Sequence, residues 1–320
     1  MSSETLLPPP EFLLPETRCG HYVTAATKSL WQVQLALLAE FIRICKRHDL
    51  EYQLLGGSLL GAMRHQGYIP WDDDIDIGML RPDYDRFLQV ASAELPPHLF
   101  LQTTLSEREY LYGFAKLRNS CTAAIEHWRV KEHRATNQGI FIDILPLDDV
   151  PAAPAPRRHL MELYSHRLMV MMQLHETPCR ARTLRGLARK LRAQCFVAAH
   201  GGWQGAYTFV EDTFRNFHFS PDAPRLTGQG TWGALHNCYE KAFWPYEAIH
   251  GECIDMPFEY LTVRVPKEYD QILTTSFGDW RTPVKGKPYH TILEYDTTRS
   301  YREVLIEKYG YTAHDFVTHQ

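Results

Sequence analysis

The feature that most constrains this chain is a run of aspartates and isoleucines that follows a pair of glycines. Residues 56–79 are GGSLLGAMRHQGYIPWDDDIDIGM. Successive side chains of a β-strand point to opposite faces, so Asp74 and Asp76 are predicted to share one face while Ile75 and Ile77 are buried on the other. Unpaired carboxylates beside a buried strand cost free energy, and a cation between them removes that cost. The pattern therefore predicts a Mg²⁺ or Mn²⁺ site on Asp74 and Asp76.

A calcium-binding EF-hand loop is the obvious rival for this segment. Asp72, Asp74 and Asp76 match three of its ligand positions, but Ile77 occupies the position that needs glycine and Asp83 the position that needs glutamate. The EF-hand is therefore excluded, because its sharp turn needs glycine where this chain has Ile77. Asp72 and Asp73 are then expected to support the loop or hold a water molecule rather than bind the ion.

The glycines mark a turn between a short predicted strand at 51–57 and a predicted helix at 58–65, with Ser58 as the helix N-cap. Glycine permits close approach of the backbone, and the amides at a helix N-terminus attract phosphate. No GK[ST] motif follows, so the turn is not a P-loop. We expect Gly57 and Ser58 to bind a phosphate next to the metal strand.

The surrounding pattern predicts an α/β chain with a mixed sheet. Apolar residues at three- and four-residue spacing predict a helix at 28–48, and apolar runs predict strands that end with 138–150. The segment PAAPAP, residues 151–156, predicts a linker. We therefore expect a catalytic core at 25–150, a mainly helical region at 151–240 that binds the acceptor, and a C-terminal strand–helix segment at 241–320 that packs on the core.

Composition narrows the class of protein. A formal net charge of −4 over 320 residues argues against a nucleic-acid binder. The basic segment 180–192 predicts a solvated helix face, with a contact to an anionic acceptor or a membrane surface as the alternative. The seven cysteines form no CxxC pair, which favours reduced thiols and a cytoplasmic location. The proline-rich N-terminus does not resemble a signal peptide, and no apolar run is long enough to predict a transmembrane segment.

With these motifs in view, residues 56–84 resemble the signature of the LicD family, which includes bacterial phosphocholine transferases and is related to fukutin-type proteins. The resemblance implies a nucleotidyltransferase-like core with a helical insertion and a C-terminal strand–helix extension. That fold carries hG[GS], matched by Gly57 and Ser58, then Dh[DE]h, matched from Asp74 to Ile77. A later strand aspartate of the fold is best matched by Asp143.

The resemblance implies a phosphotransferase that moves a phospho-alcohol group, most of all phosphocholine, from a CDP-activated donor such as CDP-choline to a hydroxyl of a cell-surface glycan or glycolipid. Metal-bound Asp74 and Asp76 would stabilise the leaving CMP. Asp143, between two isoleucines, would be either a general base with a raised pKa or a third metal ligand. Lipopolysaccharide or teichoic acid modification is the implied setting.

Further candidates surround these acids. Lys116 and Arg118 alternate along a predicted strand, so they share a face that suits the donor phosphates or is simply solvated. Arg64 is a candidate phosphate contact. Trp71 is a candidate for stacking on a base or on a choline ammonium, with a place in the core as the alternative. His290 is a candidate site residue near the C-terminus.

Two other functions use the same residues. A nucleotidyltransferase would transfer NMP and release pyrophosphate, and a catalytically silent module would bind a glycan or a nucleotide without turnover. The presence of all three acids, Asp74, Asp76 and Asp143, disfavours the silent module.

Overall fold

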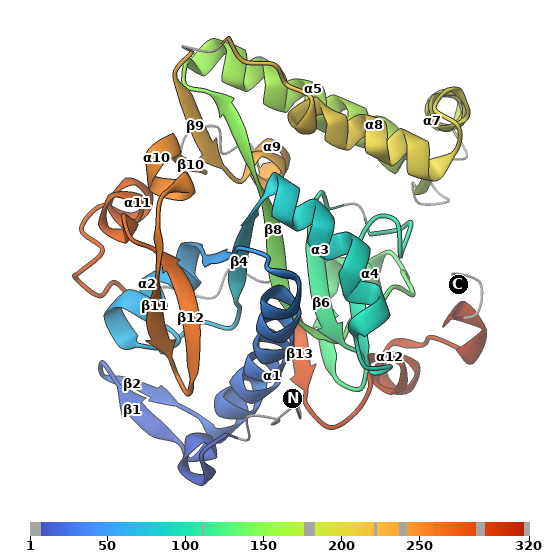
Figure 1. Cartoon of the computed structure of the whole chain (residues 1–320). Coiled ribbons are helices and arrows are strands. Elements are labelled where there is room, and N and C mark those ends of the chain that lie inside the picture. The colour runs from blue at the N-terminus through green and yellow to red at the C-terminus, as the bar shows by residue number, and fades with distance from the viewer. Residues whose placement is uncertain are drawn as a thin grey trace. The chain divides into compact units, whose positions relative to one another are not determined.

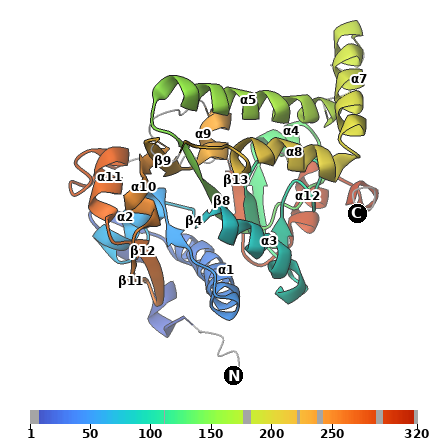
Figure 2. The same cartoon turned by 45° about the horizontal axis from the view of Figure 1, so that its top comes forward.

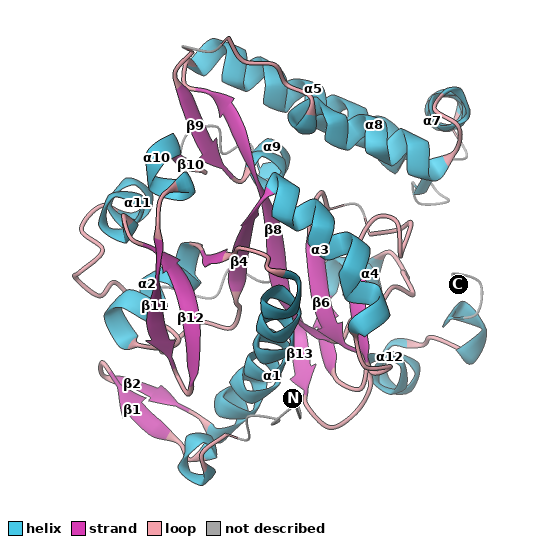
Figure 3. Ribbon diagram, in the orientation of Figure 1, coloured by secondary structure: helices cyan, strands magenta, loops and turns pink. Residues whose placement is uncertain are grey.

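The computed structural model describes residues 8–110, 112–175, 183–220, 223–236, 242–285 and 292–316 (Figure 1). The chain divides into two compact units. The first contains Met1–Leu101, Lys116–Leu145 and Gly251–Gln320, and the second contains Gln102–Ala115 and Pro146–His250. None of the described helices is long and apolar enough to cross a membrane. The mixed α/β class expected from the sequence is confirmed (Figure 3).

The first unit begins with a 3₁₀ turn and a small hairpin before its first long helix. Its elements up to residue 131 are η1 Pro10–Leu13, β1 Glu16–Arg18, β2 His21–Val23, α1 Ala25–His48, β3 Gln53–Leu54, α2 Gly56–His65, β4 Asp76–Leu80, α3 Arg81–Glu94, β5 Leu99–Gln102, β6 Ala115–Asn119, β7 Ala123–Glu126 and α4 His127–Lys131. Helix α1 starts three residues before its predicted start because the Thr24 hydroxyl accepts a hydrogen bond from the Thr27 N–H.

A sheet holds the glycine turn and the aspartates together. Strand β3 pairs antiparallel with β4, with Leu54 opposite Ile77. Strand β4 lies next to β8, Ile140–Pro151, which also pairs with β6. Ile75, Ile77 and Met79 are fully buried, as the alternation predicts. The buried isoleucines fix which way the intervening aspartates face.

The C-terminal elements of the first unit contribute to two further two-stranded sheets, β11 (Cys253–Phe258) with β12 (Leu261–Pro266) and β13 (Ile292–Asp296) with β7. The other C-terminal elements are α11 Tyr269–Phe277, α12 Tyr301–Tyr309 and η3 Ala313–Phe316. Hairpin β11–β12 lies beside β3 through β12, and β13 pairs antiparallel with β7. Strand β13 therefore brings a segment near residue 295 to the N-terminal part of the chain.

The second unit contains a helical layer and the far end of β8. Residues 148–151 of β8 pair antiparallel with β9, which pairs with β10. The other elements are α5 Pro154–Met172, η2 Gln173–His175, α7 Leu184–Ala199, α8 Trp203–Arg215, β9 Arg225–Gly228, α9 Gly230–His236, β10 Phe243–Pro245 and α10 Tyr246–His250. Helices α5 and α8 pack together around buried side chains that include Leu160, Tyr164 and Val210.

The predicted linker at 151–156 is wrong. Pro151 ends β8, and Pro154 occupies the first turn of α5. A proline in the first turn of a helix loses no hydrogen bond, and its fixed φ favours the helical backbone. The prolines therefore end a strand and start a helix inside the second unit, and do not form an irregular linker.

One buried charge cluster offers a test of this fold. The Glu126 carboxylate accepts hydrogen bonds from the guanidiniums of Arg118 and Arg129, each at 2.9 Å, and both arginines are fully buried. Glu126→Gln leaves both cations without their charge partner, so it should lower the free energy of unfolding by about 3–5 kcal/mol, measured by urea titration. Glu252→Gln, which removes an exposed pair with Lys267, is the control and should leave the urea midpoint unchanged.

The pH dependence of this cluster has a defined sign. Burial alone would raise the pKa of Glu126, but Arg129 and Arg118 lower it below the ordinary value for glutamate. The stabilisation is therefore present above the ordinary glutamate pKa and is lost as the pH falls through the lowered value. An unchanged midpoint for Glu126→Gln would contradict a role of this cluster in stability.

Candidate functional site

The acidic run forms a loop that leads into β4. Strand β4 begins at Asp76, so Asp74 lies in the loop and the predicted strand over both residues is wrong at its N-terminal end. The physical reason is a set of hydrogen bonds from α1. Trp31 Nε1 donates to the Asp72 carbonyl at 3.0 Å, and Gln34 Nε2 donates to the Asp73 carbonyl at 2.7 Å. These carbonyls are satisfied by side chains and not by a neighbouring strand.

Three carboxylates converge in this loop. Asp72, Asp73 and Asp74 are each half-buried, and one oxygen of each lies within 4.8 Å of the others. Burial, together with the charges of Asp74 and Asp73, raises the pKa of Asp72 to about 8. Such oxygens are the ligands that Mg²⁺ and Mn²⁺ prefer, and a cation would offset the repulsion. The structure thus adds Asp72 and Asp73, expected only to support the loop, to the acids that could hold a metal.

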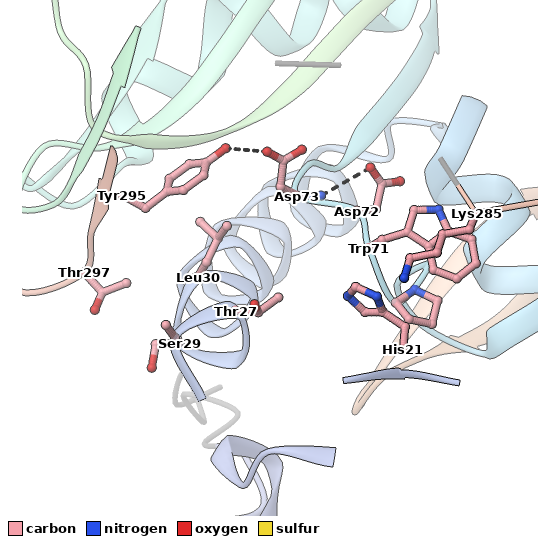
Figure 4. Close-up of a pocket in the computed structure, with 12 residues that line it drawn as sticks. His21, Thr27, Ser29, Leu30, Trp71, Asp72, Asp73, Lys285, Tyr295 and Thr297 are labelled. Carbon is pink, nitrogen blue, oxygen red and sulfur yellow. Dashed lines mark hydrogen bonds between the residues drawn. The ribbon is translucent and has the colours of Figure 1, made fainter. Parts of the chain in front are cut away.

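A tyrosine from the C-terminal part of the first unit fixes one of these acids. The Tyr295 hydroxyl in β13 donates to Asp73 Oδ2 at 2.8 Å (Figure 4). Burial and the neighbouring Asp73 raise the pKa of Tyr295 well above its ordinary value, so the phenol keeps its proton and remains a donor. The Asp73 N–H also donates to Asp72 Oδ1 at 3.2 Å. Tyr295 therefore orients the Asp73 carboxylate, and the Asp73 N–H orients that of Asp72.

A cavity of about 670 Å³ opens beside the loop, and all its lining residues belong to the first unit. The residues that line it are His21, Ala26, Thr27, Ser29, Leu30, Pro70, Trp71, Asp72, Asp73, Lys285, Tyr295 and Thr297. Trp71 packs edge-on against His21, and Figure 4 shows both close to Lys285. The cavity thus combines two carboxylates with an aromatic wall, and it is large enough for a small organic ligand.

The glycines lie against the same carboxylates. Gly56 has φ of +52°, and a Cβ there would lie 3.1 Å from Asp76 Oδ2, while a Cβ on Gly57 would lie 2.7 Å from Asp72 Oδ2. Side chains at these positions would displace the acids, so the close approach of helix α2 to the loop requires glycine. The predicted neighbourhood of glycine turn and aspartates is therefore present. Binding of phosphate by Gly57 stays a prediction.

Ser58 differs from its predicted role as N-cap. Helix α2 begins at Gly56 with Leu55 as its N-cap, which puts the buried Ser58 inside the first turn. Its Oγ accepts a hydrogen bond from the Asp76 N–H at 2.9 Å. Ser58 therefore ties the helix to the start of β4, and a contact of Ser58 with phosphate stays a prediction.

Asp143 lies beside the entry to β4, where its N–H donates to the Ile75 carbonyl at 2.8 Å. Its carboxylate forms a buried ion pair with Lys116, with Nζ 2.5 Å from Oδ1, and the ammonium also lies over the ring of Phe141. Burial lowers the pKa of Lys116. The structure brings Asp143 next to the residue that follows the acidic loop, but it pairs Lys116 with Asp143, so the expected open cationic face does not form.

The remaining candidates lie elsewhere. Arg118 is fully buried and donates to Glu126 and to the Gly139 carbonyl, which corrects the expectation that it faces donor phosphates. Arg64 donates to the Trp280 carbonyl at 2.7 Å, and burial lowers its pKa. The loop and cavity contacts described above do not include Arg64. His290 lies outside the described residues.

Sequence reasoning missed His21, Lys285 and Tyr295. His21 belongs to the N-terminal hairpin, Lys285 to a loop and Tyr295 to β13. His21 and Tyr295 are more than two hundred residues apart in the sequence. None stands in a motif with the aspartates. Only the antiparallel pairing of β13 with β7 brings Tyr295 to the acidic loop.

The acidic loop lies within a segment that matches a known protein family. Residues 49–167 match the family described as LicD/FKTN/FKRP, nucleotidyltransferase domain. The lipopolysaccharide cholinephosphotransferase LicD of Haemophilus influenzae is 28% identical over 263 residues, which cover 81% of this chain and 93% of that protein. The ribitol 5-phosphate transferase FKRP of Homo sapiens is 49% identical over 53 residues, which cover 17% of this chain and 11% of that protein.

The raised pKa of Asp72 predicts how the metal-free protein responds to pH. Because that pKa is higher in the folded state, the free energy of unfolding should fall as the pH rises from the ordinary aspartate value, about 4, to about 8. Asp72→Asn should remove most of this decline, measured by thermal unfolding in chelator. Added Mg²⁺ should stabilise the parent more than the variant at the upper pH.

Asp255→Asn, at an exposed position in β11, is the matched control and should reproduce the pH profile of the parent. Parallel profiles for the parent and Asp72→Asn would contradict the clustering of charge in this loop.

Proposed function

The chain belongs to the LicD family through residues 49–167, and on that premise we propose that it is a metal-dependent phospho-alcohol transferase. Its donor is a CDP-activated alcohol, with CDP-choline first, and its acceptor is a hydroxyl of a cell-surface glycan or glycolipid. The observation that carries the proposal is the convergence of Asp72, Asp73 and Asp74 beside Gly57 and the cavity. Carboxylates that could hold a metal, a helix start close to them and an aromatic cavity wall together suit a donor that carries phosphates and an organic cation.

The proposed reaction is a substitution at phosphorus. The acceptor oxygen attacks the phosphorus that bears the alcohol, the bond from that phosphorus to the bridging oxygen breaks, and CMP leaves with that oxygen. The proton of the acceptor hydroxyl passes to a base. A divalent ion held by the loop aspartates would supply charge neutralisation at the pyrophosphate and at the leaving CMP.

The residues of the chain orient this reaction. Asp74, which belongs to the converging carboxylates, and Asp76, which begins β4 outside that cluster, are the metal ligands that the sequence motif proposes, with Asp72 and Asp73 as further candidates. Tyr295 keeps Asp73 in its orientation. Gly56 and Gly57 allow the start of α2 to lie against the carboxylates, where helix amides favour phosphate. Trp71 forms part of the cavity wall at which the alcohol of the donor would lie.

We place the reaction in the cytoplasm. The described cysteines Cys19, Cys45, Cys121, Cys195 and Cys253 are all free thiols, as expected in a reducing compartment. The acceptor class follows the similarity to a lipopolysaccharide cholinephosphotransferase.

The first test is a screen of CDP-choline, CDP-ribitol, CDP-glycerol and CTP for metal-dependent product release, with a crude cell-surface glycan as acceptor. We expect CMP from CDP-choline in the presence of Mg²⁺ or Mn²⁺. Asp74→Asn and Asp76→Asn should each reduce turnover by about 10³-fold or more while the thermal midpoint in chelator stays level or rises. Asp255→Asn should retain full turnover.

The products separate the rival functions. Pyrophosphate as the only product, formed from CTP, would replace the proposal with nucleotidyl transfer. Unchanged biological activity in Asp74→Asn and Asp76→Asn would favour a silent binding module and overturn the proposal.

A second test addresses the donor alcohol. If the choline ammonium lies against the indole of Trp71, Trp71→Leu should raise KM for CDP-choline by about tenfold through loss of the cation–π contribution. KM for CDP-ribitol, which has no cation, should change little. Steady-state kinetics with both donors distinguish this result from general damage to the cavity, which would raise both values equally.

A further inference from the structure

Helix α7 of the second unit packs on its neighbours through small residues. Among its residues only Gly186 and Ala193 are buried, and Phe196 and Val197 near its end are partly buried against the core of the unit. Figure 2 shows α7 extending beyond the ends of α5 and α8. Most of the surface of this helix is therefore left to the solvent.

The exposed side of α7 is apolar. Leu184, Leu187 and Leu191 are 88%, 60% and 59% exposed. At about 100° per residue these three leucines fall within an arc of roughly 60°, on the side opposite Gly186 and Ala193. Exposed leucines in such a stripe differ from the scattered apolar residues of an ordinary surface, because they form one continuous band.

Cations flank this stripe. Arg185 and Arg192 lie on one side of it, Lys190 lies on the other, and all three are exposed. The sequence of α7, LRGLARKLRAQCFVAA, contains four basic residues and no acidic residue. A helix with an outward apolar stripe between basic side chains has the pattern of helices that lie in the interface of a membrane.

We propose that α7 binds an anionic lipid bilayer, with Leu184, Leu187 and Leu191 inserted among the acyl chains and the flanking cations at the lipid head groups. The helix is 16 residues long and does not qualify as a membrane span, so it lies in the interface and does not cross. The described cations of the basic segment are exposed, as expected of a solvated face, and the proposal takes up the alternative of a membrane contact; Arg180 and Arg182 lie outside the described residues. The contact is independent of the transfer reaction, because it uses no residue of the acidic loop.

Charge complementarity favours a bilayer over a second copy of the chain. Two α7 helices facing each other would bring like charges together along the rim of the stripe, which disfavours the contact. Anionic head groups instead attract Arg185 and Lys190, while Arg192 also contacts His166 of α5 at 2.8 Å, and each cation near such a surface strengthens binding roughly fivefold.

The test measures partition of the full chain onto sedimented vesicles, without donor or acceptor. Phosphatidylglycerol–phosphatidylcholine vesicles should bind the parent and pure phosphatidylcholine vesicles should bind it at least about tenfold less. Leu184→Ser/Leu187→Ser/Leu191→Ser should reduce partition onto the anionic vesicles by about tenfold or more. Arg185→Gln/Lys190→Gln should reduce it by about tenfold or more, and high salt should do the same to the parent.

The control variant is Leu14→Ser/Leu105→Ser/Ile306→Ser, which changes three exposed aliphatic residues outside α7 and should bind vesicles as the parent does. Equal binding of the parent and the α7 leucine variant would overturn the proposal, as would equal binding to neutral and anionic vesicles. A parent that sediments as a dimer while the leucine variant sediments as a monomer would also overturn it, in favour of a second copy as the occupant. Failure of vesicle binding with intact CMP release would leave the proposed function standing.

Discussion

The geometry of the site depends on how the fold resists the repulsion among the carboxylates of the loop before β4. Three acids with oxygens within 4.8 Å of one another would separate if the loop were free to move. The loop is held instead by its backbone, because Trp31 and Gln34 of α1 donate to the carbonyls of Asp72 and Asp73. The packing of α1 thereby helps to hold like charges together, and burial, followed by the charges of Asp74 and Asp73, raises the pKa of Asp72. A divalent cation bound as proposed would offset that repulsion.

The sequence predicted the elements that depend on local pattern. Helix 28–48, the strands around 76–80 and 140–150, and the proximity of the glycine turn to the aspartates all follow from periodicity or from short spacing. The start of β4 could not be predicted, because it depends on side chains of α1 about forty residues away. The contact of Tyr295 with Asp73 could not be predicted either, since it depends on the pairing of β13 with β7.

The alternation of side chains along a strand predicted the surroundings of Lys116 and Arg118 in β6 less well. It correctly implied that Lys116 and Arg118 share a face, since both lie over the ring of Phe141. It did not reveal that this face is covered, because the partners Glu126 and Asp143 lie on other strands. In α7 the predicted solvated face is present, but the exposed leucines beside it were not predicted. The basic residues drew attention to a solvated face, while the small Gly186 and Ala193 are what turn the leucines outward.

The pairing of Asp143 bears on the choice between general base and metal ligand. A general base must accept a proton, and protonation of Asp143 would leave the buried ammonium of Lys116 without its counter-charge. Because burial already lowers the pKa of Lys116, that loss would favour release of a proton from the lysine, so the pair could not gain a net proton cheaply. A cation bound at Asp143 would instead lie beside the ammonium of Lys116, and the two positive charges would repel each other. In the proposed reaction the ion pair therefore favours Asp143 as a positioning residue, and the proton of the acceptor hydroxyl would pass to one of the loop carboxylates or to water.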